Sequence, residues 1–105
     1  MILDNLKKLN IELPNAPEPV GAYVAYKKVD KLLFISGQLP IDINGKMIKG
    51  KIGKDLTLED GQKASRLCVI NILAQVKNAL NGDLNNIKNC VKITGFVNST
   101  DDFKN

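Results

Sequence analysis

The stretch of sequence that decides the fold is Leu32-Leu33-Phe34-Ile35-Ser36-Gly37-Gln38-Leu39-Pro40. Its first four residues form a short, continuous apolar run, which predicts a strand buried on both faces of a sheet. Ser36 and Gly37 follow where this strand ends. A glycine beside a serine at the end of a strand can expose backbone N–H groups, and these can hold a carboxylate. A turn that only ends the strand explains the same residues, so this pattern alone leaves both interpretations open.

The residues before this stretch predict a helix, an extended segment and a first strand. Leucines at every third position over residues 3–10 indicate a short amphipathic helix. Prolines within residues 14–19 hold the next segment extended, because each fixes its own φ and restricts the residue before it. Residues 22–29 predict a strand, joined to the next one by a tight Asp30-Lys31 turn. The hydroxyl of Tyr23 can hydrogen-bond a ligand, although a half-buried strand tyrosine with a solvated hydroxyl is the simpler interpretation.

The residues after Pro40 predict a hairpin turn and a long helix. Asn44-Gly45 is a strong hairpin signal, and residues 46–52 can add a short edge strand protected by lysines. Thr57-Leu58-Glu59-Asp60 has a hydroxyl followed three residues later by a carboxylate, which is a capping-box signature. A helix over residues 58–80 follows from apolar residues at spacings of three and four. Gly61 lies on its apolar face and can permit close approach to a sheet.

The last part of the chain predicts one more strand. Asn81-Gly82 ends the long helix. Residues 90–98 alternate between two faces, which is typical of a strand. Ser99 or Thr100 can cap the start of another helix. The order is therefore helix, three strands, long helix and strand, an α+β arrangement. An open sheet with one long helix has a bare face, which more chain or more copies must cover.

Composition narrows the class of protein. The 105 residues suit a single domain. The net charge is +4, but Arg66 is the one arginine among 15 basic residues, and there are five Phe and Tyr together. A nucleic-acid site usually needs arginines and stacking aromatics, so nucleic acid is not the expected partner, with a weak RNA-binding face as the alternative. No apolar run approaches the 18 or so residues that span a membrane.

The residue types that usually hold metals are scarce. The sequence has no histidine, the commonest general base and metal ligand. Cys68 and Cys90 have no metal-binding spacing, so no metal site and no cofactor are expected. Cys68 lies on the apolar stripe of the long helix, and a structural role is favoured for both cysteines. Two free thiols suit a reducing compartment, which indicates the cytoplasm.

Several segments together resemble the Rid (RidA/YjgF) family, in particular a less-studied branch of it. The matching segments are Asn15-Ala16-Pro17, Val20-Gly21-Ala22-Tyr23-Val24, Leu33-Phe34-Ile35-Ser36-Gly37-Gln38-Leu39-Pro40, Val91-Lys92-Ile93-Thr94-Gly95-Phe96-Val97-Asn98 and Asp102-Phe103. The resemblance implies a chorismate-mutase-like α+β fold, with a mixed sheet packed on one long helix. It also implies homotrimers with ligand pockets between subunits. The implied activity is hydrolysis of 2-imino acids, such as 2-iminobutanoate and 2-iminopropanoate, to 2-keto acids and ammonia. Older family labels name a translation inhibitor or an L-PSP-like endoribonuclease.

The resemblance also implies the site residues. Tyr23 corresponds to a pocket wall, and Ser36 and Gly37 correspond to its floor. The family's carboxylate-binding arginine and its late glutamate belong to strands that would follow Asn105, and Arg66 does not match that arginine. Ala22 replaces the proline usual before the tyrosine. Residues 1–105 are therefore expected to be the N-terminal portion of a Rid domain that lacks the last helix and strands. Deaminase activity is not expected from them, and a non-catalytic carboxylate-binding trimer is the alternative.

Overall fold

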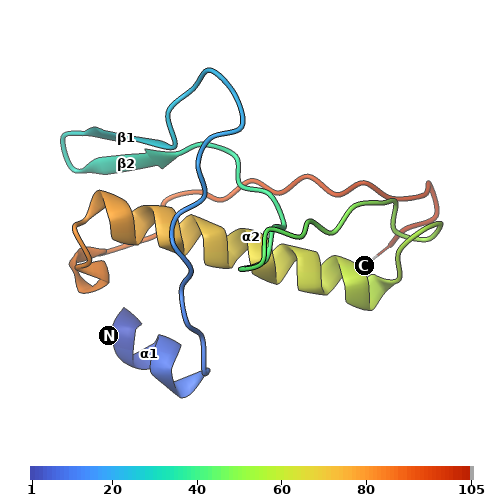
Figure 1. Ribbon diagram of the computed structural model, residues 1–105, viewed down its shortest axis with the longest axis horizontal. Helices are drawn as coiled ribbons and strands as arrows, with labels where there is room; N and C mark the ends of the chain where they lie inside the picture. Colours follow the sequence, from blue (N-terminus) through green and yellow to red (C-terminus); the bar gives the residue numbers. More distant parts are fainter. Residues whose placement is uncertain (105) are drawn as a thin grey trace.

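The computed structural model describes residues 1–104, which form a small antiparallel sheet and a long helix (Figure 1). The elements in chain order are α1 (Ile2–Lys8), β1 (Tyr26–Val29), β2 (Leu32–Ile35), α2 (Leu58–Ala79) and the 3₁₀ helix η1 (Leu84–Asn86). The α+β class is therefore confirmed. The other segments of the chain are arranged around α2.

Helix α2 begins and ends where the sequence predicts. The Thr57 hydroxyl oxygen accepts a hydrogen bond from the Asp60 N–H at 3.1 Å, and the Asp60 carboxylate accepts one from the Thr57 N–H at 2.9 Å. This capping box satisfies N–H groups that the first turn leaves without partners. At the other end, Asn81 and Gly82 have φ of 55° and 92°, and the Gly82 N–H donates to the Lys77 carbonyl at 2.8 Å. A left-handed conformation of this kind closes a helix.

The sheet consists of one hairpin, in which Tyr26 pairs with Ile35 and Val29 pairs with Leu32. The predicted two-residue turn is present, with Asp30 at φ 54°. The first strand begins at Tyr26 instead of residue 22, because the chain bends over residues 20–23.

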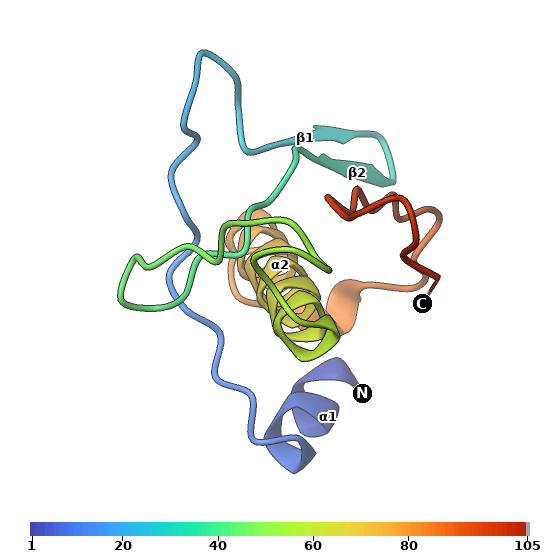
Figure 2. The ribbon, with the colours of Figure 1, turned by 90° about the vertical axis from the view of Figure 1, so that its right-hand side faces the viewer.

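One face of the hairpin is bare. Val29 and Leu32 are a cross-strand pair, and Phe34 is two residues after Leu32, so all three lie on the same face. Their side chains are 52%, 49% and 58% exposed. The opposite face lies toward α2 (Figure 2). The expectation of a bare sheet face is confirmed. The prediction that β2 is buried on both faces is wrong, because α2 covers only one face.

The segment between β2 and α2 contains the predicted turn but no third strand. The Gly45 N–H donates to the Asp42 carbonyl at 3.0 Å, and Ile41 forms an isolated bridge with Met47. The edge strand predicted over residues 46–52 does not form. Gly50 and Gly53 have φ of 141° and 94°, and these positive values turn the chain out of an extended path. Gly61 does permit close packing, but against the side chain of Ile52 in this loop and not against a strand.

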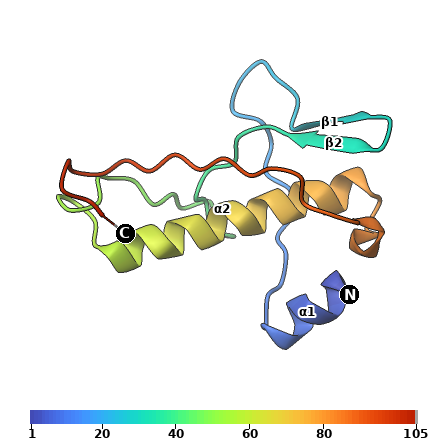
Figure 3. The ribbon, with the colours of Figure 1, turned by 180° about the vertical axis from the view of Figure 1, so that it is seen from behind.

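Residues 88–98 run along α2 as an extended segment (Figures 1 and 3). The strand predicted over 90–98 is wrong as a sheet element, because only the end of the segment reaches a pairing partner. There the Ile52 N–H donates to the Asn98 carbonyl at 3.0 Å, and the Thr100 N–H donates to the Ile52 carbonyl at 2.9 Å. Within residues 1–104, a single turn stands where the sequence predicts a helix from Ser99 or Thr100. The Phe103 N–H closes this turn by donating to the Thr100 carbonyl.

The core is small and lies on α2 and just after it. Ala74, Val76 and Leu84 are its buried apolar residues. Helix α1 packs on η1 and lies below α2 in Figure 2, and the Leu3 N–H donates to the Asn85 side chain at 3.3 Å. Within residues 1–104, no helix combines the length and the apolar character that crossing a bilayer requires.

Candidate functional site

A shallow cleft opens where the end of β2 meets the loop before β1, above the C-terminal half of α2. Tyr23, Ser36 and Gly37, which the sequence resemblance marks as ligand-binding residues, all line it. The other lining residues are Pro17, Glu18, Pro19, Val20, Ala25, Gln38, Leu39, Ile41 and Gln75. The three predicted residues therefore come together in one cleft, although Tyr23 and Ser36 are 13 positions apart in the sequence.

Ser36 is tied to the first strand of the hairpin. Its N–H and its hydroxyl both donate to the Ala25 carbonyl, at 2.9 Å and 3.0 Å. The hydroxyl proton is thus already used, and the oxygen can only accept from a ligand. The neighbouring Gly37 is exposed, and no atom would contact a Cβ built on it. Its N–H has no hydrogen-bond acceptor among residues 1–104, so it can donate to a ligand.

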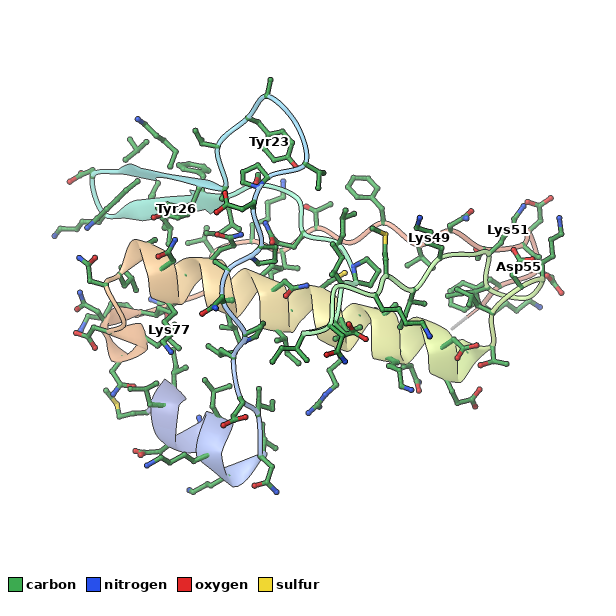
Figure 4. The ribbon with its side chains drawn as sticks, in the orientation of Figure 1. Tyr23, Tyr26, Lys49, Lys51, Asp55 and Lys77 are labelled. Carbon is green, nitrogen blue, oxygen red and sulfur yellow. The ribbon has the colours of Figure 1, made fainter. Side chains whose placement is uncertain are left out.

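Tyr23 lies on the loop before β1, not in the strand where the sequence suggested (Figure 4). The side chain is 47% exposed. Its ring lies against Gly21, where an added Cβ would come within 3.1 Å of Cε1. A larger residue at position 21 would therefore displace the ring, so Gly21 helps to set the position of the tyrosine at the cleft.

Two buried amides on α2 support the cleft from below, and the sequence analysis missed them. Gln75 and Asn71 are each 2% exposed. Gln75 Nε2 donates to the Pro17 carbonyl at 2.7 Å, and Asn71 Nδ2 donates to the carbonyls of Leu39 and Ile41 at 2.9 Å and 3.0 Å. The available signal was two amides spaced by four within an apolar helix face, since buried polar groups usually have partners.

A second, more open groove lies next to the cleft. It runs between residues 13–17 and the turn at residues 41–45, and Asn71 lines it. Pro17 and Ile41 border both hollows. The loop that Asn71 holds therefore forms a wall between the two.

Charge in the cleft comes from Glu18, and no Lys or Arg belongs to its described lining. Arg66 is exposed on α2 and does not line the cleft. Burial raises the pKa of the Cys68 thiol, which keeps it protonated and poorly nucleophilic. Within residues 1–104, no three His, Cys, Asp or Glu side chains gather in a way that could hold a metal ion.

The chain matches a known protein family over almost all of its length. The model of a family described as "YjgF/chorismate mutase-like, putative endoribonuclease" matches residues 4–103. The chain belongs to the YjgF (Rid) family. This membership confirms the resemblance seen in the sequence and the chorismate-mutase-like fold that it implied.

Proteins similar to this chain come from distant organisms. The protein TCP17 of Trypanosoma cruzi is 41% identical over 99 residues, which cover 94% of this chain and 61% of that protein. A RutC family protein of Pyrococcus horikoshii is 32% identical over 90 residues, covering 85% of this chain and 61% of the relative. The crystal structure of a protein of unknown function from Agrobacterium tumefaciens superposes with a TM-score of 0.83 at 42% identity, covering 96% of this chain and 61% of that one. The chain thus spans about three fifths of the length of these relatives, each covered to 61%.

Proposed function

We propose that the cleft lined by Tyr23, Ser36 and Gly37 binds small 2-imino and 2-keto carboxylates, and that it is the site where 2-imino acids are hydrolysed in a Rid-type deaminase. The observation that carries this proposal is the shared cleft itself. Three residues chosen from the sequence resemblance line one hollow, beside a backbone N–H that is available to a ligand.

The cleft offers groups that suit such a ligand. The Gly37 N–H can donate to a carboxylate oxygen, and the Tyr23 hydroxyl can donate to a carboxylate or to an imine nitrogen. Val20, Leu39 and Ile41 provide an apolar wall for a short alkyl chain. In the reaction, a water oxygen bonds to the imine carbon, the carbon–nitrogen bond breaks, and ammonia leaves with protons from the water. The products are the 2-keto acid and ammonia.

Binding by these residues alone is expected to be weak and without turnover. The described lining includes the acidic Glu18 but no arginine, whereas a bidentate guanidinium is the strongest partner for a carboxylate. The family resemblance assigns the arginine and the catalytic glutamate to strands that would follow position 105. We therefore expect residues 1–105 to hold the keto acid, and hydrolysis to require the arginine and glutamate as well.

The binding claim is tested by titrating the isotope-labelled chain with 2-oxobutanoate and recording amide spectra. The Gly37 and Gln38 amides should shift progressively with ligand. 2-Butanone is the control, because it keeps the four-carbon ketone and lacks the carboxylate, so it should cause a much smaller shift. Equal shifts with both compounds, or none with 2-oxobutanoate, would reject the carboxylate site.

The hydrolysis claim needs an assay of imine breakdown. A pyridoxal-phosphate-dependent dehydratase generates 2-iminobutanoate from threonine, and release of 2-oxobutanoate is followed with and without the protein. We expect acceleration by a version that carries the arginine and glutamate segment, and none by residues 1–105 alone. A longer version that leaves the rate unchanged would overturn the deaminase assignment.

We also propose that the chain acts as one domain of a homotrimer in the cytoplasm, with the clefts at subunit boundaries. The bare apolar face of the hairpin, formed by Val29, Leu32 and Phe34, supports association, because exposed apolar patches mark interaction sites. The free thiols of Cys68 and Cys90 support a reducing compartment.

Ribonuclease activity is the second candidate, because the matching family description names an endoribonuclease. The exposed ring of Phe96 offers a stacking surface, but Arg66 is the chain's one arginine. RNA cleavage by highly purified protein, measured beside the dehydratase assay, distinguishes the two activities. Cleavage that co-purifies with the protein through several columns would favour the ribonuclease.

A further inference from the structure

The side chain of Gln75 joins three segments that lie far apart in the sequence. Its Nε2 donates to the Pro17 carbonyl at 2.7 Å and to Gln38 Oε1 at 3.5 Å, and Gln38 Nε2 donates to the Ser36 carbonyl at 3.1 Å. Gln75 is 2% exposed and lines the floor of the cleft. The two N–H bonds of its amide are therefore both directed at the walls of the proposed ligand site.

We propose that Gln75 is the positioning residue that fixes the orientation of the Ser36–Gly37 peptide at the cleft, acting through Gln38. This inference rests on the proposed function, since it assigns to Gln75 the orientation of the group that would hold the ligand carboxylate. Gln75 itself does not have to touch the ligand.

The argument follows from the geometry of one peptide unit. The Ser36 carbonyl and the Gly37 N–H belong to the same planar peptide, and in a trans peptide they point in opposite directions. Gln38 Nε2 holds the Ser36 carbonyl on one side. The Gly37 N–H is thereby directed to the other side and cannot rotate independently. Glycine at position 37 would otherwise leave this peptide free to reorient.

Gln75 fixes the orientation of Gln38 in turn. An amide side chain has a donor end and an acceptor end, and Gln75 Nε2 meets the acceptor end of Gln38. Gln38 therefore presents its donor end to Ser36. The second N–H of Gln75 holds Pro17, so the same residue sets the separation between the proline segment and the end of β2. Burial makes both bonds costly to lose, because the carbonyl and amide oxygens would remain without donors.

The test compares Gln75→Met with Val76→Ala in the 105-residue chain. Methionine keeps the length of glutamine and removes both donors. Val76 is the next residue of α2, is 8% exposed and lines neither hollow, so its truncation reports a general loss of core packing.

Amide spectra are recorded first without ligand and then with 2-oxobutanoate. We expect Gln75→Met to shift the Gly37 and Gln38 amides and to weaken binding about tenfold, as loss of one aligned hydrogen bond implies. Val76→Ala should lower the melting temperature with less than about a twofold change in affinity.

Each result decides the inference. Unchanged Gly37 and Gln38 amides in Gln75→Met overturn it, and so does a loss of affinity no larger than that of Val76→Ala. If the wild-type chain does not bind 2-oxobutanoate, the proposed function fails, and the ligand-free spectra still decide whether Gln75 orients the peptide. If Gln75→Met does not fold, Gln38→Met interrupts the same path and keeps the bond from Gln75 to Pro17. It should produce the same shift at Gly37, and an unshifted Gly37 amide would refute the path.

Discussion

At the scale of single residues, what the cleft can bind depends on which of its described polar atoms are not already hydrogen-bonded within the protein. The Ser36 hydroxyl donates to Ala25, so its proton is not available to a ligand carboxylate. Gly37 and Tyr23 supply the available donors, and Glu18 supplies a negative charge in the same cleft. A carboxylate ligand therefore has donors to bind and one like charge to avoid.

Replacing Glu18 with Gln should strengthen the binding of 2-oxobutanoate by roughly two- to fivefold, since removing an exposed like charge changes the free energy by about 0.5–1 kcal/mol. The gain should shrink at high salt, because ions screen the repulsion. The measurement is the dissociation constant from amide shifts at two salt concentrations. Glu12→Gln is the control, because Glu12 is exposed and does not line the cleft. Equal effects of both substitutions would show that only net charge matters.

At the scale of elements, the capping box gives α2 a pH-dependent start. The hydrogen bond from the Thr57 N–H, the Thr57 side chain and the nearby Lys63 charge hold the pKa of Asp60 below its ordinary value of 3.8. A carboxyl with a lowered pKa stabilises the folded state above its unfolded pKa, and this contribution is lost as pH falls through the lowered value. Asp60→Asn keeps an acceptor for Thr57 and removes the charge.

We expect Asp60→Asn to melt at a lower temperature than the wild type near neutral pH, with the difference closing as the pH falls below 3.8. Thermal melts over a pH series measure this. Glu59→Gln, a neighbour in the first turn without a capping-box bond, should have a smaller effect. A difference between wild type and Asp60→Asn that persists in strong acid would contradict the assignment.

The loop before α2 also holds the last described segment of the chain. Gly53 has φ of 94°, and a Cβ there would overlap the Thr100 hydroxyl. Gly53→Ala should therefore destabilise the protein by about 1–3 kcal/mol and release the pairing between Ile52 and Thr100. Urea denaturation measures the loss of stability, and hydrogen exchange of the Thr100 amide measures the release of its pairing with Ile52.

Gly82→Ala separates backbone strain from steric overlap. Gly82 has nearly the same φ, 92°, and no atom within 4 Å of an added Cβ. The Gly82→Ala substitution should lower the free energy of unfolding by about 1 kcal/mol, because alanine is strained in the left-handed conformation. It should leave the hydrogen exchange of the Thr100 amide unchanged. Faster exchange at Thr100 in both variants would mean that the effect is global.

At the scale of the whole molecule, apolar surface that this chain leaves uncovered favours association. Val29, Leu32 and Phe34 form the bare face of the hairpin, and Val91, Ile93 and Phe96 on the extended segment are 82%, 67% and 95% exposed. Larger apolar surfaces of this kind are usually buried in an interface.

We expect the chain to form trimers at high micromolar concentration, as measured by sedimentation or light scattering. Phe34→Lys should weaken association at least about tenfold, because it places a charge in the apolar patch. Leu9→Lys is the control, since Leu9 is also exposed, at 63%, but lies beyond the C-terminal end of α1 and away from the hairpin. A wild-type chain that stays monomeric at all concentrations would reject the trimer.

The sequence by itself determined the elements whose hydrogen bonds are local. The capping box at Thr57, the end of α2 at Gly82 and the turn at Gly45 all involve partners within a few residues, so their signals are complete in the sequence. It also determined the family, through the segment around Ser36 and Gly37, which lines the cleft.

Only the tertiary structure decided which extended segments pair and which polar groups serve the cleft. A strand needs an edge to pair with, and residues 90–98 alternate as a strand should but meet a partner only at their end. The spacing of Asn71 and Gln75 on an apolar helix face could mark them as buried amides, but not their partners, because the Gln75 partner Pro17 is 58 positions away in the sequence. Non-local hydrogen bonds of this kind arise from how segments pack, and no short sequence pattern encodes them.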